Sequence, residues 1–250
     1  YTMPLERLHG VAVGSRVVAL GSSTGGPAAL MQIFGAFDQA PPVSFIVSQH
    51  MPKGFTRSFA ARLDRLTTLR AREAVDGSDL EEGQILIAPG GSHLEFENQG
   101  GRPRARVVPS EPTDKYAPAV DRMFESAAKA FGSELLAVVL TGMGDDGSRG
   151  AQAVREAGGT VIAESEQSAV IFGMPQQVIR AGAANTVLPL DEIPGAILSG
   201  GTVPAGVAES ALVVIGASSV WIGTFESVPQ VPQTRSRRST APTIWAALAR

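Results

Sequence analysis

The sequence predicts an α/β protein with a doubly wound, mostly parallel sheet, helices on both faces and a small inserted β-hairpin. Apolar, β-branched runs alternate with segments of helical period, which is typical of parallel strands joined by crossover helices. One segment, 91–108, instead alternates polar and apolar residues around a Gly-Gly pair, which favours a hairpin. With 250 residues, of which 44% are hydrophobic, the chain is long enough to bury a sizeable core.

The apolar runs are the expected strands of the sheet. In chain order they lie at about 17–21, 43–48, 85–88, 136–141, 160–163 and 186–189. Helix signals occur between them. Pro27 to Phe37 begins with a proline, which suits a first helical turn because its missing N–H would be unpaired there anyway.

Two further segments show one-sided helical patterns. In the first, apolar residues four apart share a face: Phe55, Phe59 and Leu63. In the second, spacings of three and four predict an apolar face of Val120, Met123, Phe124, Ala127 and Phe131, with Asp121, Glu125 and Lys129 turned outward.

A shift in composition near residue 198 predicts the end of the folded domain. The expected organisation is an N-terminal linker remnant at 1–13, a folded domain at 14–198 and a C-terminal tail of uncertain structure at 199–250. The chain starts at Tyr1 instead of methionine, which suggests a piece of a longer product.

Composition argues against several functions. The formal net charge is -3 and no basic stripe occurs in 1–200, so nucleic acid is not an expected partner. There is no cysteine, hence no disulfide and no cysteine-ligated metal, and we expect neither a metal nor a cofactor. No signal pattern and no apolar run of about 20 residues is present, so we expect a cytoplasmic protein without membrane insertion.

The stretch "GSSTG" at 21–25 fits the G-x-S-x-G spacing of a nucleophile elbow, in which a serine, here Ser23, sits on a sharp strand-to-helix bend. A phosphate-binding loop is the alternative, because a helix start also attracts anions. That alternative is weaker, since the turn lacks the G-x-G-x-x-G pattern and the second strand ends in Gln49 and His50, where a dinucleotide fold has an acid.

A serine nucleophile needs a base that titrates near neutral pH, and the chain has 3 histidines. His50 follows the strand expected to neighbour that of Ser23, at the sheet edge where ligands bind in open α/β folds. His9 lies in the N-terminal segment and is expected to be solvated. His93 opens the hairpin and is expected at the surface or at a strand edge.

The loop "MGDDGSRG" follows another buried strand and offers Asp145 and Asp146 at the same edge. One of them could orient the imidazole, as in a serine triad, or the pair could form an ordinary Asp-Gly turn. The order serine, histidine, aspartate differs from the serine, acid, histidine order of α/β-hydrolases, which makes a small-molecule carboxylesterase of that type the weaker alternative.

Several segments together resemble the catalytic domain of the bacterial chemotaxis-receptor methylesterases, in order from about residue 14 to residue 197: "GSSTGGP", "QHMPKGFTRSFAARL", "ILIAPGGSHL", "YAPAVDRMFESAA", "VVLTGMGDDGSRG" and "VIFGMP". The resemblance implies hydrolysis of glutamate γ-methyl esters on chemoreceptor cytoplasmic helices, with deamidation of receptor glutamines at the same site. It also implies that Ser23 is the nucleophile, His50 the general base and Asp146 the triad aspartate, with Asp145 a turn residue.

Three further residues are expected to line the site. The backbone N–H groups of Thr24 and Met143 are candidates for the oxyanion hole, because loops at the same sheet edge carry them. Arg57, after His50, either meets the acidic receptor helix or is a solvated surface arginine.

The resemblance leaves open which regulatory partner the protein has and whether it has kept the reaction. Family members commonly carry an N-terminal receiver domain whose phosphorylation relieves inhibition, and no such domain precedes "LERLHGVAVG" in this sequence, so a receiver domain or a response regulator is a possible partner. A binding module that has lost the reaction is a further alternative, weakened by the presence of Ser23, His50 and Asp146.

Overall fold

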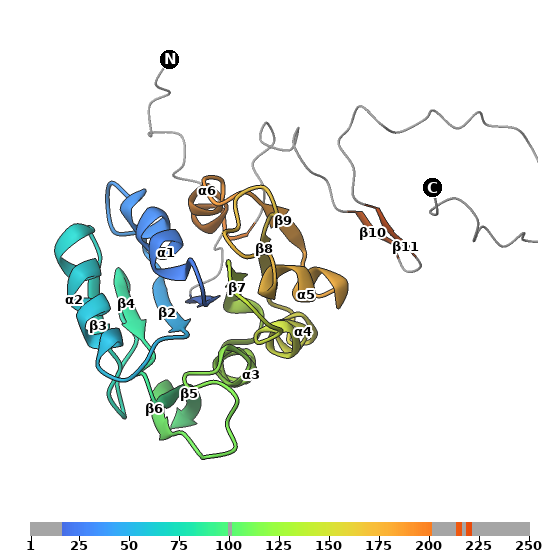
Figure 1. Cartoon of the computed structure of the whole chain (residues 1–250). Helices are drawn as coiled ribbons and strands as arrows, with labels where there is room; N and C mark the ends of the chain where they lie inside the picture. Colours follow the sequence, from blue (N-terminus) through green and yellow to red (C-terminus); the bar gives the residue numbers. More distant parts are fainter. Residues whose placement is uncertain (1–16, 100–101, 202–213, 217–218, 222–250) are drawn as a thin grey trace, which may run out of the picture.

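The computed structural model describes residues 17–99, 102–201, 214–216 and 219–221. Its centre is a sheet of 7 parallel strands in the order β3-β4-β2-β1-β7-β8-β9 (Figure 1). The strands are β1 Val17–Ser22, β2 Ser44–Gln49, β3 Arg70–Glu73, β4 Gln84–Ile87, β7 Leu135–Val139, β8 Thr160–Glu164 and β9 Thr186–Leu188. The doubly wound parallel sheet predicted from the sequence is thus confirmed.

Helices cover both faces of this sheet, as predicted (Figure 1). They are α1 Gly26–Gly35, α2 Phe55–Leu66, α3 Val120–Phe131, α4 Ser148–Glu156, α5 Met174–Arg180 and α6 Ile193–Leu198, with a 3-10 turn, η2, at Gly132–Glu134. Side chains of α1, α2 and α6 share one apolar cluster, and those of α3, α4 and α5 share the other.

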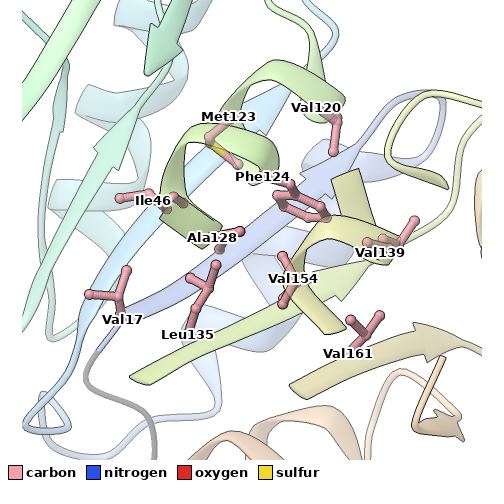
Figure 2. Close-up of a cluster of buried hydrophobic side chains, with 14 of the residues drawn as sticks. Val17, Ile46, Val120, Met123, Phe124, Ala128, Leu135, Val139, Val154 and Val161 are labelled. Carbon is pink, nitrogen blue, oxygen red and sulfur yellow. The ribbon is translucent and has the colours of Figure 1, made fainter. Parts of the chain in front are cut away.

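The two cores follow from the alternation of side chains along β1. Val18 and Leu20 belong to the cluster under α1, while Val17 and Ala19 belong to the cluster under α3. Because both faces are buried, the strands are continuous apolar runs, which is why the sequence revealed them. Figure 2 shows the second cluster, with Phe124 of α3 packed over the strands.

Two elements differ from the sequence expectation. β3 lies outside the predicted strands, because it is an edge strand of polar residues, "RARE", that pairs only with β4. Phe55 was expected on the buried face of its helix with Phe59 and Leu63, but it is 65% exposed. It is the first residue of α2, where the helix starts beyond the edge of the core.

The predicted hairpin is also confirmed. β5 Ser92–Gln99 and β6 Arg102–Pro109 form an antiparallel pair outside the main sheet. Phe96 of β5 contacts Phe131 of α3 edge-on, with ring centres 5.5 Å apart, and Leu94 joins the same core as α3. The hairpin therefore packs against α3.

The proposed terminal segments fall largely outside the described residues. Residues 1–13 are not among them, and within 199–250 the structure describes 199–201 and a short antiparallel pair, β10 Val214–Gly216 and β11 Ser219–Trp221. Among the residues that the structure describes, no helix has both the length and the apolar character needed to cross a bilayer.

The order of the strands creates a switch point at β1. The chain passes from β1 to β2 on one side, and later places β7 on the other side of β1. Loops that follow adjacent strands at such a point diverge and leave a crevice at the carboxyl edge of the sheet. This edge holds Ser23 after β1, His50 after β2 and Asp146 after β7.

A buried carboxylate supports the loop after β7. Glu164, at the end of β8, is fully buried and accepts a hydrogen bond from the Thr141 N–H at 2.7 Å and another from the Ser168 hydroxyl at 2.9 Å. Burial raises the pKa of the Glu164 carboxyl above its usual value, although both hydrogen bonds oppose this shift.

Glu164→Gln tests this buried charge, because the glutamine carbonyl oxygen can accept from the Thr141 N–H while its amide N–H donates to the Ser168 oxygen. A raised pKa means that the folded chain binds a proton at a pH where the unfolded chain has lost it. Relative to Glu164→Gln, the wild type should therefore lose stability as the pH rises through the raised pKa and regain it on acidification. Urea unfolding of both proteins from acidic to neutral pH measures this difference. A difference independent of pH would contradict it.

Gly26→Ala and Gly35→Ala make the same change at opposite ends of α1. A Cβ on Gly26 would lie 2.0 Å from Gln49 Oε1 and 2.7 Å from Ser22 Oγ, whereas a Cβ on Gly35 would meet nothing within 4 Å. We expect Gly26→Ala to cost about 2 kcal/mol of stability or more, and Gly35→Ala to add about 0.5 kcal/mol by reducing the entropy of the unfolded chain. Equal effects in chemical denaturation would refute this account.

Candidate active site

The turn from β1 to α1 presents one of two adjacent serines. Gly25 in this turn has φ 86°, a left-handed conformation that favours glycine. Ser22 is fully buried, and its hydroxyl donates to Gln49 Oε1 at 2.7 Å. Ser23 is partly exposed, and its hydroxyl makes no hydrogen bond to the described part of the chain. Ser23 is therefore the hydroxyl that is available for chemistry.

Gln49, the last residue of β2, ties this turn to the neighbouring strand. Its side chain is nearly inaccessible, with the residue 2% exposed, and its amide N–H groups donate to the backbone carbonyls of Ser23 and His50, both at 3.0 Å. The Gln49 side chain thus holds the loop of Ser23, the candidate nucleophile, at a fixed distance from the loop of His50, the candidate base. From the sequence, Gln49 was significant only because it stands where a dinucleotide fold has an acid, and no local pattern indicates its contacts with two loops.

His50 directly follows β2, where its N–H donates to the Ser22 carbonyl at 3.0 Å. Its Nε2 lies 2.7 Å from Asp146 Oδ2, and the two side chains are 13% and 3% exposed. Because a carboxylate only accepts hydrogen bonds, Nε2 must carry the proton and donate it. In the neutral imidazole this leaves Nδ1 as the basic nitrogen.

Asp146 also accepts hydrogen bonds from the first turn of α3. The Val120 N–H donates to Oδ2 at 2.7 Å and the Asp121 N–H donates to Oδ1 at 2.8 Å. These N–H groups have no partner within their own helix, and the positive end of the helix dipole favours a negative charge at this place. The carboxylate is therefore fixed in position and electrostatically stabilised beside His50.

Asp121 was expected to face outward, and this prediction was wrong. Its side chain is 16% exposed and accepts hydrogen bonds from the N–H groups of Gly147 at 2.9 Å and Gly150 at 2.7 Å, at the start of α4. Burial, together with the charge of Asp146, raises the pKa of the Asp121 carboxyl. Asp146 thus caps α3, which begins beside Asp121, and Asp121 caps α4, which begins beside Asp146. Together these contacts hold the loop after β7 against α3.

Thr24 and Met143, the candidates for the oxyanion hole, lie on two loops that contact each other. Thr141 Oγ1 donates to the Thr24 carbonyl at 2.9 Å, and a Cβ on Gly142 would lie 2.8 Å from Ser23 Cβ. Thr24 and Met143 are exposed, and within the described residues their N–H groups donate no hydrogen bond. Both N–H groups are thus unpaired within the described residues, that of Thr24 directly after Ser23 and that of Met143 directly after Gly142.

The structure separates Arg57 and Asp145 from this cluster of contacts. Arg57 is on α2 with its side chain 83% exposed, and its Nε donates to Glu73 Oε2 at 3.3 Å. Asp145 is exposed and pairs with Lys115 at 2.8 Å, an ion pair that raises the pKa of Lys115 to about 12. Neither side chain forms a hydrogen bond or ion pair with His50 or Asp146 within the described residues.

His93 was expected at the surface or at a strand edge; it lies in an edge strand, since β5 pairs with β6 alone among the described strands, but not at the surface. It is fully buried, because β5 packs against α3. Its Nδ1 accepts the Ala119 N–H at 3.2 Å, so Nε2 carries the proton and donates to Asp114 at 2.8 Å. His93 therefore has a structural part in holding the segment before α3. His9 lies outside the described residues.

Comparison with known proteins now places these residues in a family. The family model described as CheB methylesterase matches residues 18–197. The chain is 51% identical over 177 residues to a protein-glutamate methylesterase/protein-glutamine glutaminase of Geobacter sulfurreducens, covering 71% of this chain and 48% of that protein. It is 46% identical over 183 residues to a protein of the same description from Pseudomonas aeruginosa, covering 73% of this chain and 52% of the relative.

A solved structure agrees with this match. The CheB methylesterase catalytic domain of Thermotoga maritima aligns with a TM-score of 0.71 at 43% identity, covering 74% of this chain and 98% of that domain. The chain spans about half the length of the curated relatives it matches. The family model covers most of the chain, and it includes every strand of the main sheet apart from the first residue of β1. The chain therefore belongs to the CheB methylesterase family.

Proposed function

We propose that this protein is a serine hydrolase that converts glutamate γ-methyl esters on chemoreceptor cytoplasmic helices to glutamate and methanol, and deamidates glutamines there. The observation that carries the proposal is the His50–Asp146 hydrogen bond of 2.7 Å at the sheet edge that also holds Ser23. The names of the relatives, protein-glutamate methylesterase/protein-glutamine glutaminase, support the same substrate chemistry.

In the proposed mechanism, the Ser23 hydroxyl attacks the ester carbonyl while His50 Nδ1 takes its proton. The resulting imidazolium donates from Nε2 to Asp146, which stabilises the new charge. His50 then returns the proton to the departing methoxide, and methanol leaves an acyl-enzyme. Water, deprotonated by the same imidazole, releases glutamate. With a glutamine substrate the leaving group is ammonia.

The Thr24 and Met143 N–H groups are the proposed oxyanion donors, each contributing about 3 kcal/mol in the transition state. All proton transfers pass through protein side chains, so the proposed reaction uses no cofactor and no metal. Arg57 is exposed and is a proposed contact for the acidic receptor helix. Because the substrates are cytoplasmic helices, the cytoplasm is the proposed compartment.

We assign the reaction to residues 14–198, with 1–13 as a linker and 199–250 as a tail. The match of the family model to 18–197 supports the central range. A receiver domain or a response regulator outside this sequence is the proposed regulatory partner.

Ser23→Ala should abolish methanol release from a methylated receptor cytoplasmic fragment, with a loss of several powers of ten in kcat, about 10⁴-fold or more, as in other triads. Ser58→Ala is the matched control, because Ser58 is an exposed serine on α2 whose hydroxyl, among the described residues, donates to the Gly54 carbonyl alone. Release by Ser23→Ala at the control rate would refute the proposal. Rapid turnover of short acyl nitrophenyl esters, with none of the receptor fragment, would favour a small-molecule carboxylesterase instead.

Asp146→Asn should reduce kcat by about 10³-fold or more, because an asparagine cannot accept all the hydrogen bonds that Asp146 accepts and favours the wrong imidazole tautomer. The same change should cost about 1–3 kcal/mol of stability, since one buried N–H of α3 faces an amide donor. Initial rates measured well below the unfolding transition separate the two effects. A variant that is less stable but fully active would show that Asp146 serves the fold alone.

A further inference from the structure

Tyr116 lies flat against the proposed general base. Its ring stacks on the imidazole of His50 with ring centres 4.4 Å apart and an angle of 10° between the planes. The residue belongs to the connection between β6 and α3. Tyr116 takes no part in the proton transfers proposed for Ser23, His50 and Asp146.

The segment that carries Tyr116 is held at both ends. Before it, Asp114 accepts hydrogen bonds from His93 Nε2 at 2.8 Å and from the Glu111 N–H at 2.7 Å. After it, the Ala119 N–H donates to His93 Nδ1 at 3.2 Å. The buried His93 of β5 therefore bridges the residues on both sides of Tyr116. These contacts fix the place of Tyr116 relative to the hairpin.

The far end of the ring reaches the loop after β7. A Cβ on Gly144 would lie 2.5 Å from the Tyr116 hydroxyl oxygen, so only glycine leaves room for the phenol there. The neighbouring Lys115 pairs with Asp145 of the same loop at 2.8 Å. Tyr116 thus covers His50 and contacts the loop that carries Asp146.

The stack supplies a constraint that the hydrogen bond to Asp146 lacks. A single hydrogen bond fixes the position of Nε2 but lets the imidazole rotate about that bond. Such a rotation would move Nδ1 away from the Ser23 hydroxyl that it deprotonates in the proposed mechanism. A parallel ring contact fixes the plane of the imidazole. In addition, the face of an aromatic ring attracts a cation, so the Tyr116 ring favours the imidazolium formed in the proposed reaction over the neutral imidazole. Lys115 Nζ also lies over this ring, 4.9 Å from its centre, and pairs with Asp145.

We propose that Tyr116 is a positioning residue for His50, holding the plane of the imidazole and stabilising the imidazolium by stacking; this inference rests on the proposed function. The aromatic face carries the effect, and the hydroxyl does not. The substitutions Tyr116→Phe and Tyr116→Leu separate these two parts of the side chain.

Methanol release from the methylated receptor fragment gives the first test. Tyr116→Leu should lower kcat about tenfold and leave KM within about twofold, while Tyr116→Phe keeps at least about half of the wild-type kcat. Phe55→Leu, an aromatic change at a 65% exposed position of α2, is the control for general effects. An unchanged kcat in Tyr116→Leu, an equal loss in Tyr116→Phe, or a change confined to KM would each overturn the proposal.

Proton NMR gives a second test that needs no activity, so failure of the proposed function and failure of the stacking can be told apart. In the wild type, the ring current of Tyr116 should move the carbon-bound imidazole protons of His50 upfield of their unfolded positions. The shift should persist in Tyr116→Phe and vanish in Tyr116→Leu. Should the leucine variant fail to fold, the wild-type spectrum still decides, because unshifted His50 protons would overturn the proposal. A shifted spectrum with no methanol release by the wild type would refute the proposed function alone.

Discussion

The carboxylate of Asp146 is the interaction on which the rest of the site depends. Its two oxygens accept hydrogen bonds from His50 Nε2, the Val120 N–H and the Asp121 N–H, all between 2.7 and 2.8 Å. It thereby joins the end of β2, the loop after β7 and the start of α3. The N–H groups at a helix N-terminus donate to both oxygens of this side chain, so it can be nearly buried with its hydrogen-bonding capacity satisfied and still accept from the imidazole.

The sheet explains why residues far apart in sequence meet. In a parallel sheet every strand ends at the same edge, and the switch at β1 opens that edge between diverging loops. Pairing of β1 with β2 aligns Ser22 with Gln49, so Ser23 and His50 follow as neighbours at the ends of two adjacent strands. Gln49 then fixes the spacing of the two loops through the carbonyls of both residues. The site is therefore a consequence of strand register supported by a few buried polar side chains.

The sequence predicted the parallel sheet, the hairpin and the residues at the strand ends, because buried strands are visible as apolar runs and polar residues mark where the runs before Ser23, His50 and Asp146 stop. It failed where tertiary packing decides the environment of a polar residue. Asp121 has the spacing of a solvent-facing residue but caps a neighbouring helix, and His93 is buried because the hairpin folds onto α3. The stack of Tyr116 on His50 joins the loop after β2 to the connection between β6 and α3. These segments are far apart in sequence, so the spacing of residues within either one could not predict the contact.

The proposed mechanism requires that His50 donates its Nε2 proton to Asp146 and keeps Nδ1 free as the base. Nitrogen-15 NMR of the imidazole, at a pH where the ring is neutral, distinguishes the two tautomers, since protonated and unprotonated ring nitrogens have well-separated shifts. We expect a protonated Nε2 whose hydrogen resonates far downfield, together with an unprotonated Nδ1. A neutral ring protonated at Nδ1 would rule out this mechanism, because Asp146 could then accept no hydrogen bond from His50 in the observed geometry.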